Sequence, residues 1–115
     1  MTEYEIQQIH EAAKLLTRDL RATMTVSELA QKVRLPVRKL QEGFRKEFNK
    51  TVYNYLLEER MIKAKEMLLA HRPVKYVARK VGYVGANAET NFIKAFHKRF
   101  QVTPMQWTRQ QKKVV

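Results

Sequence analysis

The chain has 115 residues and no cysteine, and its 23 Lys and Arg outnumber 11 Asp and Glu to give a formal net charge of +12. This length suffices for one compact domain or two very small ones, which excludes a multidomain enzyme, and the absence of cysteine excludes disulfides and Cys-ligated zinc fingers. Because so much positive charge opposes compaction, it indicates an anionic partner, ranked as nucleic acid before an anionic membrane or an acidic protein.

The residue composition predicts an all-α protein. Apolar residues make up 44% of the chain, which contains only 3 Gly and 3 Pro. Good helix formers dominate the remainder, so helices joined by short turns are expected. No apolar stretch approaches the roughly 20 residues of a membrane span, and the polar start MTEYEIQQ is unlike a signal peptide. We therefore expect a cytoplasmic protein without a membrane partner.

Two capping boxes open the first predicted helices. Thr2 with Glu5 begins a long amphipathic helix, and Thr25 with Glu28 begins a short one. Pro36 then favours the start of a third helix after a tight turn. The apolar residues of this third helix that we expect to face inward are Val37, Leu40, Phe44 and Phe48.

The second half of the sequence predicts a long helix followed by three shorter ones. The long helix is expected over residues 52–71, with apolar contacts from Tyr55, Leu56, Ile62, Leu68 and Leu69. Pro73 opens a short helix that Gly82 ends. The next helix carries Phe92, Phe96 and Phe100, and Thr103 caps a terminal helix, which brings the expected number to about seven.

An internal repeat defines the organisation of the chain. The segment VSELAQKV at residues 26–33 matches VKYVARKV at residues 74–81, and two aromatic-rich stripes of spacing four follow them. Each half is thus a short helix, a turn and a longer helix, which is the helix-turn-helix arrangement. We expect two such units in residues 1–51 and 72–115, joined by a linker helix over residues 52–71.

Each longer helix of the repeat has a polar face opposite its apolar stripe. Such side chains suit base edges and phosphates, although a solvated surface has partly the same composition. The candidate DNA-binding residues are Arg38, Gln41, Glu42 and Arg45 on the first helix, and Thr90, Lys94, His97 and Lys98, with Asn91 on the flank, on the second. A linker of about 20 residues is about 30 Å long, and one turn of B-DNA is about 34 Å, so one chain could present both helices to successive major-groove segments.

The sequence resembles the DNA-binding domain of the AraC/XylS family of bacterial regulators. The resemblance is carried by LAQKVRLPVRKLQEGFRKEF, by EERMIKAKEMLL, and most specifically by VARKVGY followed by NFIKAFHKRFQVTP. It implies two helix-turn-helix units that bind promoter or operator DNA. It also implies control of transcription, which in this family commonly involves contact with RNA polymerase. A sensing or dimerising domain is then expected in a longer parent chain. It assigns contacts to Arg38, Gln41 and Glu42, with Arg45 nearby, and to Thr90, Asn91 and Lys94.

Three features depart from the family pattern. The segment VGANAET places about three extra residues before Phe92, which makes a base contact by Glu89 doubtful. Asn49 and Gln101 stand where Gly is common. Asn tolerates the left-handed conformation, whereas Gln101 is expected to need another solution. A carboxylate at Glu42 implies either a hydrogen bond from cytosine N4 or a role in orienting Arg38 or Arg45.

No constellation for catalysis is visible in the sequence. The three histidines have no metal-ligand spacing, and no glycine-rich loop offers a phosphate cradle, so we expect no enzyme, cofactor or metal. The main alternative to a DNA-binding regulator is a basic helical protein-interaction module. RNA binding also stays open, although the Phe residues fall on the core stripes rather than on a stacking platform.

Overall fold

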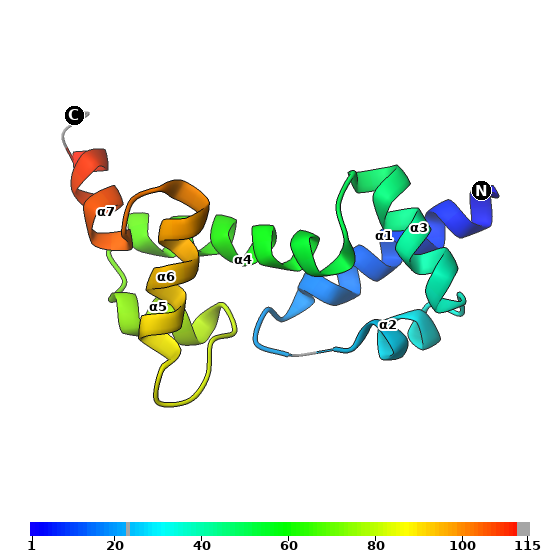
Figure 1. The fold of residues 1–115 in the computed structure, drawn as a ribbon, viewed down its shortest axis with the longest axis horizontal. Helices are drawn as coiled ribbons and strands as arrows, with labels where there is room; N and C mark the ends of the chain where they lie inside the picture. Colours follow the sequence, from blue (N-terminus) through cyan, green and yellow to red (C-terminus); the bar gives the residue numbers. More distant parts are fainter. Residues whose placement is uncertain (23, 113–115) are drawn as a thin grey trace. The chain divides into compact units, whose positions relative to one another are not determined.

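The computed structural model describes residues 1–22 and 24–112, and within them it contains seven α-helices and no strand (Figure 1). The predicted all-α class, with two helix-turn-helix subdomains and a long connecting helix, is thus confirmed. The helices are α1 (Glu3–Arg18), α2 (Val26–Lys32), α3 (Val37–Phe48), α4 (Val52–Leu69), α5 (Val74–Lys80), α6 (Ala88–Phe100) and α7 (Pro104–Lys112).

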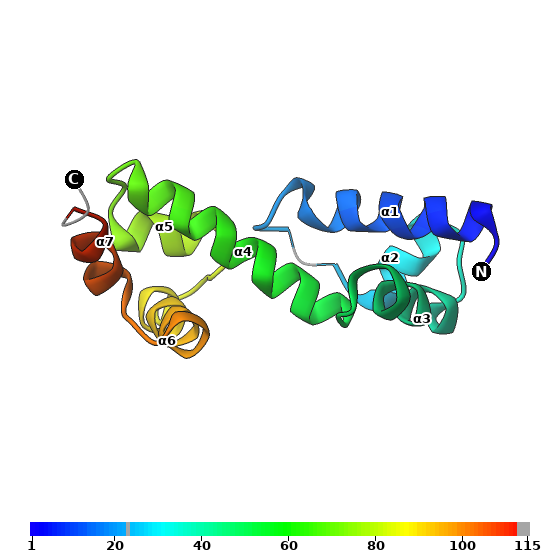
Figure 2. The same cartoon turned by 90° about the horizontal axis from the view of Figure 1, so that it is seen from above.

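The chain divides within α4 into two compact units, Met1–Glu59 and Arg60–Val115. In the first unit, α1 packs on α2 and α3, and α2 packs on α3 (Figure 2). In the second unit, α6 packs on α5 and α7. Each unit has its own apolar core, the first around Ile9, Leu29, Leu40 and Phe44 and the second around Met61, Val77, Val81, Phe92 and Phe96.

The predicted capping boxes fix where the first helices begin. The Thr2 hydroxyl accepts from the Glu5 amide at 3.1 Å, and the Glu5 carboxylate accepts from the Thr2 amide at 2.8 Å. The bond from the Thr2 amide is the main reason why the pKa of Glu5 lies below its ordinary value, and the neighbouring Lys39 lowers this pKa further. Thr25 and Glu28 form the same pair of bonds at the start of α2.

The turn after the short helix has the same hydrogen bonds in both units. Arg34 N donates to Gln31 O at 3.2 Å, and Leu35 N donates to Ala30 O at 3.0 Å. The corresponding bonds of the second unit run from Gly82 to Arg79 and from Tyr83 to Ala78, at 3.2 and 3.0 Å. This is the Schellman termination, whose central residue has a positive φ, here 57° at Arg34 and 112° at Gly82. The repeat seen in the sequence is therefore also a repeat of backbone geometry.

The connection to the longer helix differs between the units. Residues 34–36 lie between the α2 cap and α3, whereas residues 82–87 lie between the α5 cap and α6, which is three residues more. Gly85, with φ at 87°, begins the extra turn, and its carbonyl accepts from Ala88 N at 3.2 Å. The predicted enlargement of this turn is confirmed.

The ends of the two longer helices are alike. Asn49 and Gln101 are the C-caps of α3 and α6, and both adopt the left-handed conformation, with φ at 57° and 62°. Gln101 also donates from its side-chain amide to Lys98 O at 3.1 Å. Both residues thus adopt the left-handed conformation that favours glycine, so the expectation that Gln101 needs another solution is wrong.

Some expected core contacts are wrong. Val37 is 39% exposed because it is the first residue of α3 and precedes Leu40, the first residue of the helix that is buried in the core. Ile62 and Leu69 are 46% and 54% exposed, since each follows a buried residue of α4 by one position and therefore points about 100° around the helix from it. The long helix also ends at Leu69 rather than at residue 71, because His71 has φ at 62° and terminates it.

Candidate nucleic-acid interface

The outer face of α3 carries the first predicted set of DNA-binding residues. Leu40, Gly43 and Phe44 form the buried side of this helix. The predicted set lies opposite, where Arg38, Gln41 and Arg45 are exposed and Glu42 is partly exposed. These side chains are therefore presented together on one accessible surface of the first unit.

Arg38 and Glu42 form an ion pair on this surface. The Nε atom of Arg38 donates to Oε1 of Glu42 at 3.0 Å, while the Arg38 side chain stays 89% exposed. Only one of the five guanidinium N–H donors is used in this bond, so the other donors can meet a ligand. Of the roles expected for Glu42, the orientation of Arg38 is the one that these distances support.

The outer face of α6 carries the second predicted set. Ala88, Phe92 and Phe96 are buried on the inner side of this helix. The predicted residues are all exposed: Thr90, Asn91, Lys94, His97 and Lys98. Hydrogen-bonding and cationic groups are thus gathered on the side of α6 that faces away from the core.

Two aromatic residues of the predicted stripe in the second unit are core residues, as expected, whereas Phe100 is only partly buried. Phe92 and Phe96 are completely buried, with their ring centroids 5.9 Å apart. Tyr83 packs on Phe92 at 5.7 Å, and Trp107 packs on Phe96 at 6.2 Å. The buried rings of Phe92 and Phe96 thus hold α6 in place and are not available for stacking of single-stranded bases.

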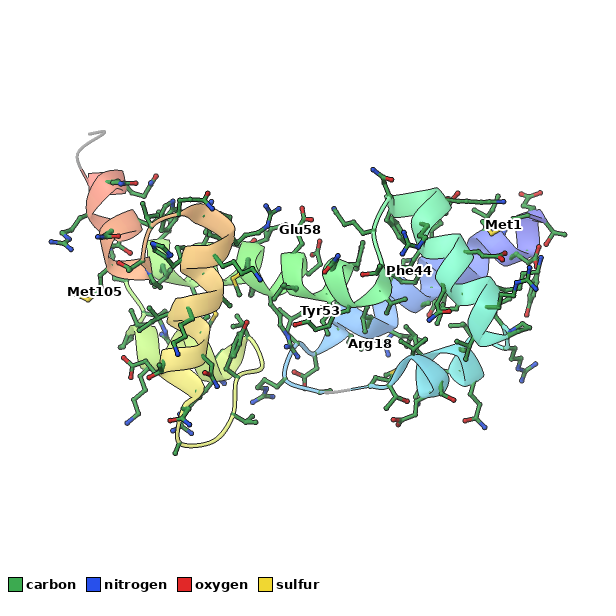
Figure 3. All side chains as sticks on the ribbon, in the orientation of Figure 1. Met1, Arg18, Phe44, Tyr53, Glu58 and Met105 are labelled. Atoms are coloured by element: carbon green, nitrogen blue, oxygen red, sulfur yellow. The ribbon has the colours of Figure 1, made fainter. Side chains whose placement is uncertain are left out.

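Glu89 does not belong to the polar face of α6. It lies on the flank of the helix, where it lines a hollow together with Val74, Ile93 and Pro104. Met105, at the start of α7, also lines this hollow, and its side chain, which is labelled in Figure 3, is 65% exposed. The sequence-based doubt about Glu89 thus agrees with its position.

The sequence-based set omitted the cations of the shorter helix of the second unit. Lys75, Arg79 and Lys80 are exposed on α5, and Arg72 lies just before it. The guanidinium carbon of Arg72 is 4.2 Å from the ring centroid of Tyr76. These residues could have been found in the sequence by comparing α2 and α5 position by position through the repeat, because two of these cations then stand where α2 has uncharged residues.

Metal sites and membrane spans are absent from residues 1–22 and 24–112. No group of three or more His, Cys, Asp or Glu side chains in this range is arranged to hold a metal ion. Nor does any helix there have the length and apolar character needed to cross a membrane.

Comparisons with known proteins agree with this geometry. The family model described as "Helix-turn-helix domain" matches residues 29–110. The regulatory protein PchR of Pseudomonas aeruginosa is 41% identical over 64 residues, which is 56% of this chain and 22% of that protein. The chain thus corresponds to a small part of the length of this relative.

Two solved structures have the same fold. A DNA-binding transcriptional dual regulator from Escherichia coli K-12 superposes with a TM-score of 0.78, at 20% identity, over 92% of this chain and 93% of that one. The C-terminal domain of AraT, a response regulator from Geobacillus stearothermophilus, superposes with a TM-score of 0.76, at 24% identity, over 95% and 86% of the two chains. From the family match, together with these likenesses, the chain belongs to the helix-turn-helix domain family and, within it, to the AraC/XylS regulators.

Proposed function

We propose that this chain binds double-stranded DNA in a sequence-specific manner and regulates transcription, with α3 and α6 as its recognition helices. The observation that carries the proposal is that both units repeat one turn geometry and expose a polar helix face opposite a buried stripe. In a helix-turn-helix unit, the second helix lies in the major groove with its side chains at the base edges. The family match favours this function over a basic protein-interaction module.

The roles of the individual residues follow from their chemistry. Arg38 and Gln41 suit bidentate bonds to guanine and adenine, and Glu42 holds Arg38 in place. Arg45, Lys94 and Lys98 suit phosphates, to which point charges and guanidinium groups bind without reading sequence. The shorter side chains of Thr90 and Asn91 suit base edges, and His97 suits a phosphate oxygen.

The arrangement in the parent protein is part of the proposal. We expect the two recognition helices, joined through α4, to occupy successive major-groove segments of promoter or operator DNA. We also propose that the chain acts in the cytoplasm without catalysing a reaction, that RNA polymerase is a protein partner, and that a sensing or dimerising domain accompanies it in a longer chain.

Competition binding tests the proposal. Fluorescence anisotropy of a labelled duplex selected from a random library is measured against unlabelled specific duplex, shuffled duplex and single-stranded RNA. We expect the specific duplex to compete at least 100-fold better than the shuffled one, because specific sites typically bind about 10³-fold or more tighter than others. Equal competition by all three competitors contradicts sequence-specific binding and favours the protein-interaction module.

A further inference from the structure

The positive charge is divided very unequally between the two units. Residues 1–59 contain ten Lys and Arg against nine Asp and Glu, whereas residues 60–115 contain thirteen against two. The first unit thus has a formal charge of +1 and the second has +11. Because both units form the same helix-turn-helix arrangement, the fold itself does not require this difference.

The cations of the two units also have different neighbours. In the first unit, carboxylates neutralise several of them, for example Lys50 beside Glu58 at 2.7 Å and Lys39 beside Glu5 at 3.4 Å. In the described part of the second unit, Lys63 pairs with Glu66, and other cations lie over aromatic rings. The closest of these ring contacts are Lys65 on Phe100 at 3.7 Å and Arg72 on Tyr76 at 4.2 Å. A ring attracts a cation without cancelling its charge, so the second unit keeps its positive field.

The difference is clearest between the equivalent helices α2 and α5. The repeat places Lys75 where the first unit has Ser27, and Arg79 where it has Gln31. All four side chains are exposed, so packing does not dictate any of them. Lys80, whose equivalent is Lys32, lies 5.4 Å from the ring centroid of Tyr76, the same ring that Arg72 contacts. Four cations therefore surround the exposed side of α5, and we call Arg72, Lys75, Arg79 and Lys80 the α5 basic surface.

Building on the proposed function, we propose that the second unit is the electrostatic anchor of the chain on DNA, and that the α5 basic surface contacts phosphates. The first helix of a helix-turn-helix unit crosses the DNA backbone, where cations meet phosphates rather than bases. Each phosphate contact releases counterions, so that the affinity falls as the salt concentration rises. The near-neutral first unit contributes only weakly to this electrostatic part of the binding. The first unit, with its Arg38–Glu42 pair, then contributes mainly to sequence discrimination.

The internal repeat supplies a matched exchange for the test. In the complete chain, Lys75→Ser with Arg79→Gln gives α5 the residues that α2 has at these two positions. Binding to a selected duplex and to a shuffled duplex is measured from low to high salt. The slope of log affinity against log salt is negative, and we expect this exchange to reduce its magnitude by about two, because each phosphate contact contributes about 0.9. It should weaken binding to both duplexes by the same factor, so that the ratio of the two affinities is preserved.

Two control variants and the parent chain complete the test. Lys75→Arg with Arg79→Lys keeps both charges and should keep the slope. Lys14→Gln with Arg18→Gln removes two cations from α1 of the first unit and should change the slope by less than one. Circular dichroism checks that each variant is folded.

The outcomes separate this inference from the proposed function. An unchanged slope after the α5 exchange, or an equal fall for the α1 variant, overturns the anchor while sequence-preferring binding by the parent chain leaves the proposed function intact. Absence of duplex binding by the parent chain overturns the proposed function, and the anchor with it.

Discussion

Arg38 and Glu42 lie one turn apart on α3, and the Nε of the guanidinium donates to the carboxylate at 3.0 Å. This bond restricts the orientations of a side chain that is otherwise 89% exposed. An arginine presented in a fixed orientation discriminates bases better than a freely rotating one, since bidentate recognition depends on geometry. The pair thus links the local structure of α3 to the proposed specificity.

Replacing Glu42 should therefore relax specificity more than it weakens binding. In Glu42→Ala, we expect the preference for the selected base under α3 to fall by about 1 kcal/mol, or about fivefold, which is the lower end of the discrimination of one bidentate contact. Affinity for shuffled duplex should stay equal or rise, because a negative charge is lost. Selection of bound sequences from a randomised site provides the measurement, with Glu11→Ala as a control that removes the same charge from α1. An unchanged base preference in Glu42→Ala would contradict this role.

Lys94 should act on phosphates rather than on bases. It is exposed on the outer face of α6. Lys94→Ala is expected to reduce the magnitude of the negative salt slope by about one and to weaken binding to all duplexes by a similar factor. Lys63→Ala serves as the matched control, because Lys63 on α4 is already paired with Glu66 at 3.1 Å. If both variants keep the parent slope, Lys94 has no phosphate contact.

The turn of the first unit should become more stable with glycine. Arg34 has φ at 57°, and the equivalent residue in the second unit is Gly82. A left-handed conformation costs a non-glycine residue about 1 kcal/mol, so Arg34→Gly should raise the free energy of unfolding by about that amount. Gly82→Ala should lower it by about 1 kcal/mol or more, because its φ of 112° suits alanine even less. Urea denaturation followed by circular dichroism measures both, and destabilisation by Arg34→Gly is the opposite of the expected result.

Gly43 should be needed for the close packing of α1 on α3. A Cβ atom at this position would overlap Cδ1 and Cγ1 of Ile9, which is completely buried. Overpacking typically costs about 1–3 kcal/mol, which exceeds the gain of about 1 kcal/mol from the better helix propensity of alanine. We therefore expect Gly43→Ala to destabilise the first unit in urea or thermal denaturation.

A double variant tests the cause of that loss. If the overlap with Ile9 is responsible, Gly43→Ala combined with Ile9→Ala should cost less than the sum of the two single changes. Strict additivity would show that Gly43 matters for another reason.

The features that the sequence predicted best depend on neighbouring residues in the chain. Capping boxes such as Thr25 with Glu28 are satisfied within one turn, and the Arg38–Glu42 pair needs only the helical spacing. The burial of Phe92 and Phe96 was predictable because large aromatic residues spaced by four lie on one side of a helix, and such a side is usually buried. Local rules were sufficient in these cases.

Burial and charge distribution were harder to predict. The exposure of Val37, Ile62 and Leu69 depends on which face of a helix meets its neighbours, which the apolar pattern alone does not specify. The cations of α5 were missed because exposed lysines and arginines follow no periodicity. Lys75 and Arg79 become informative only beside Ser27 and Gln31, once the two units are known to have the same turn.

The central claim is that one chain reads duplex DNA with two recognition helices, and in vitro selection from a random duplex library tests it most directly. We expect two short conserved blocks in the selected sequences, separated by about 10 base pairs from centre to centre, which is one turn of B-DNA. A single conserved block, or no enrichment of any sequence, would contradict it.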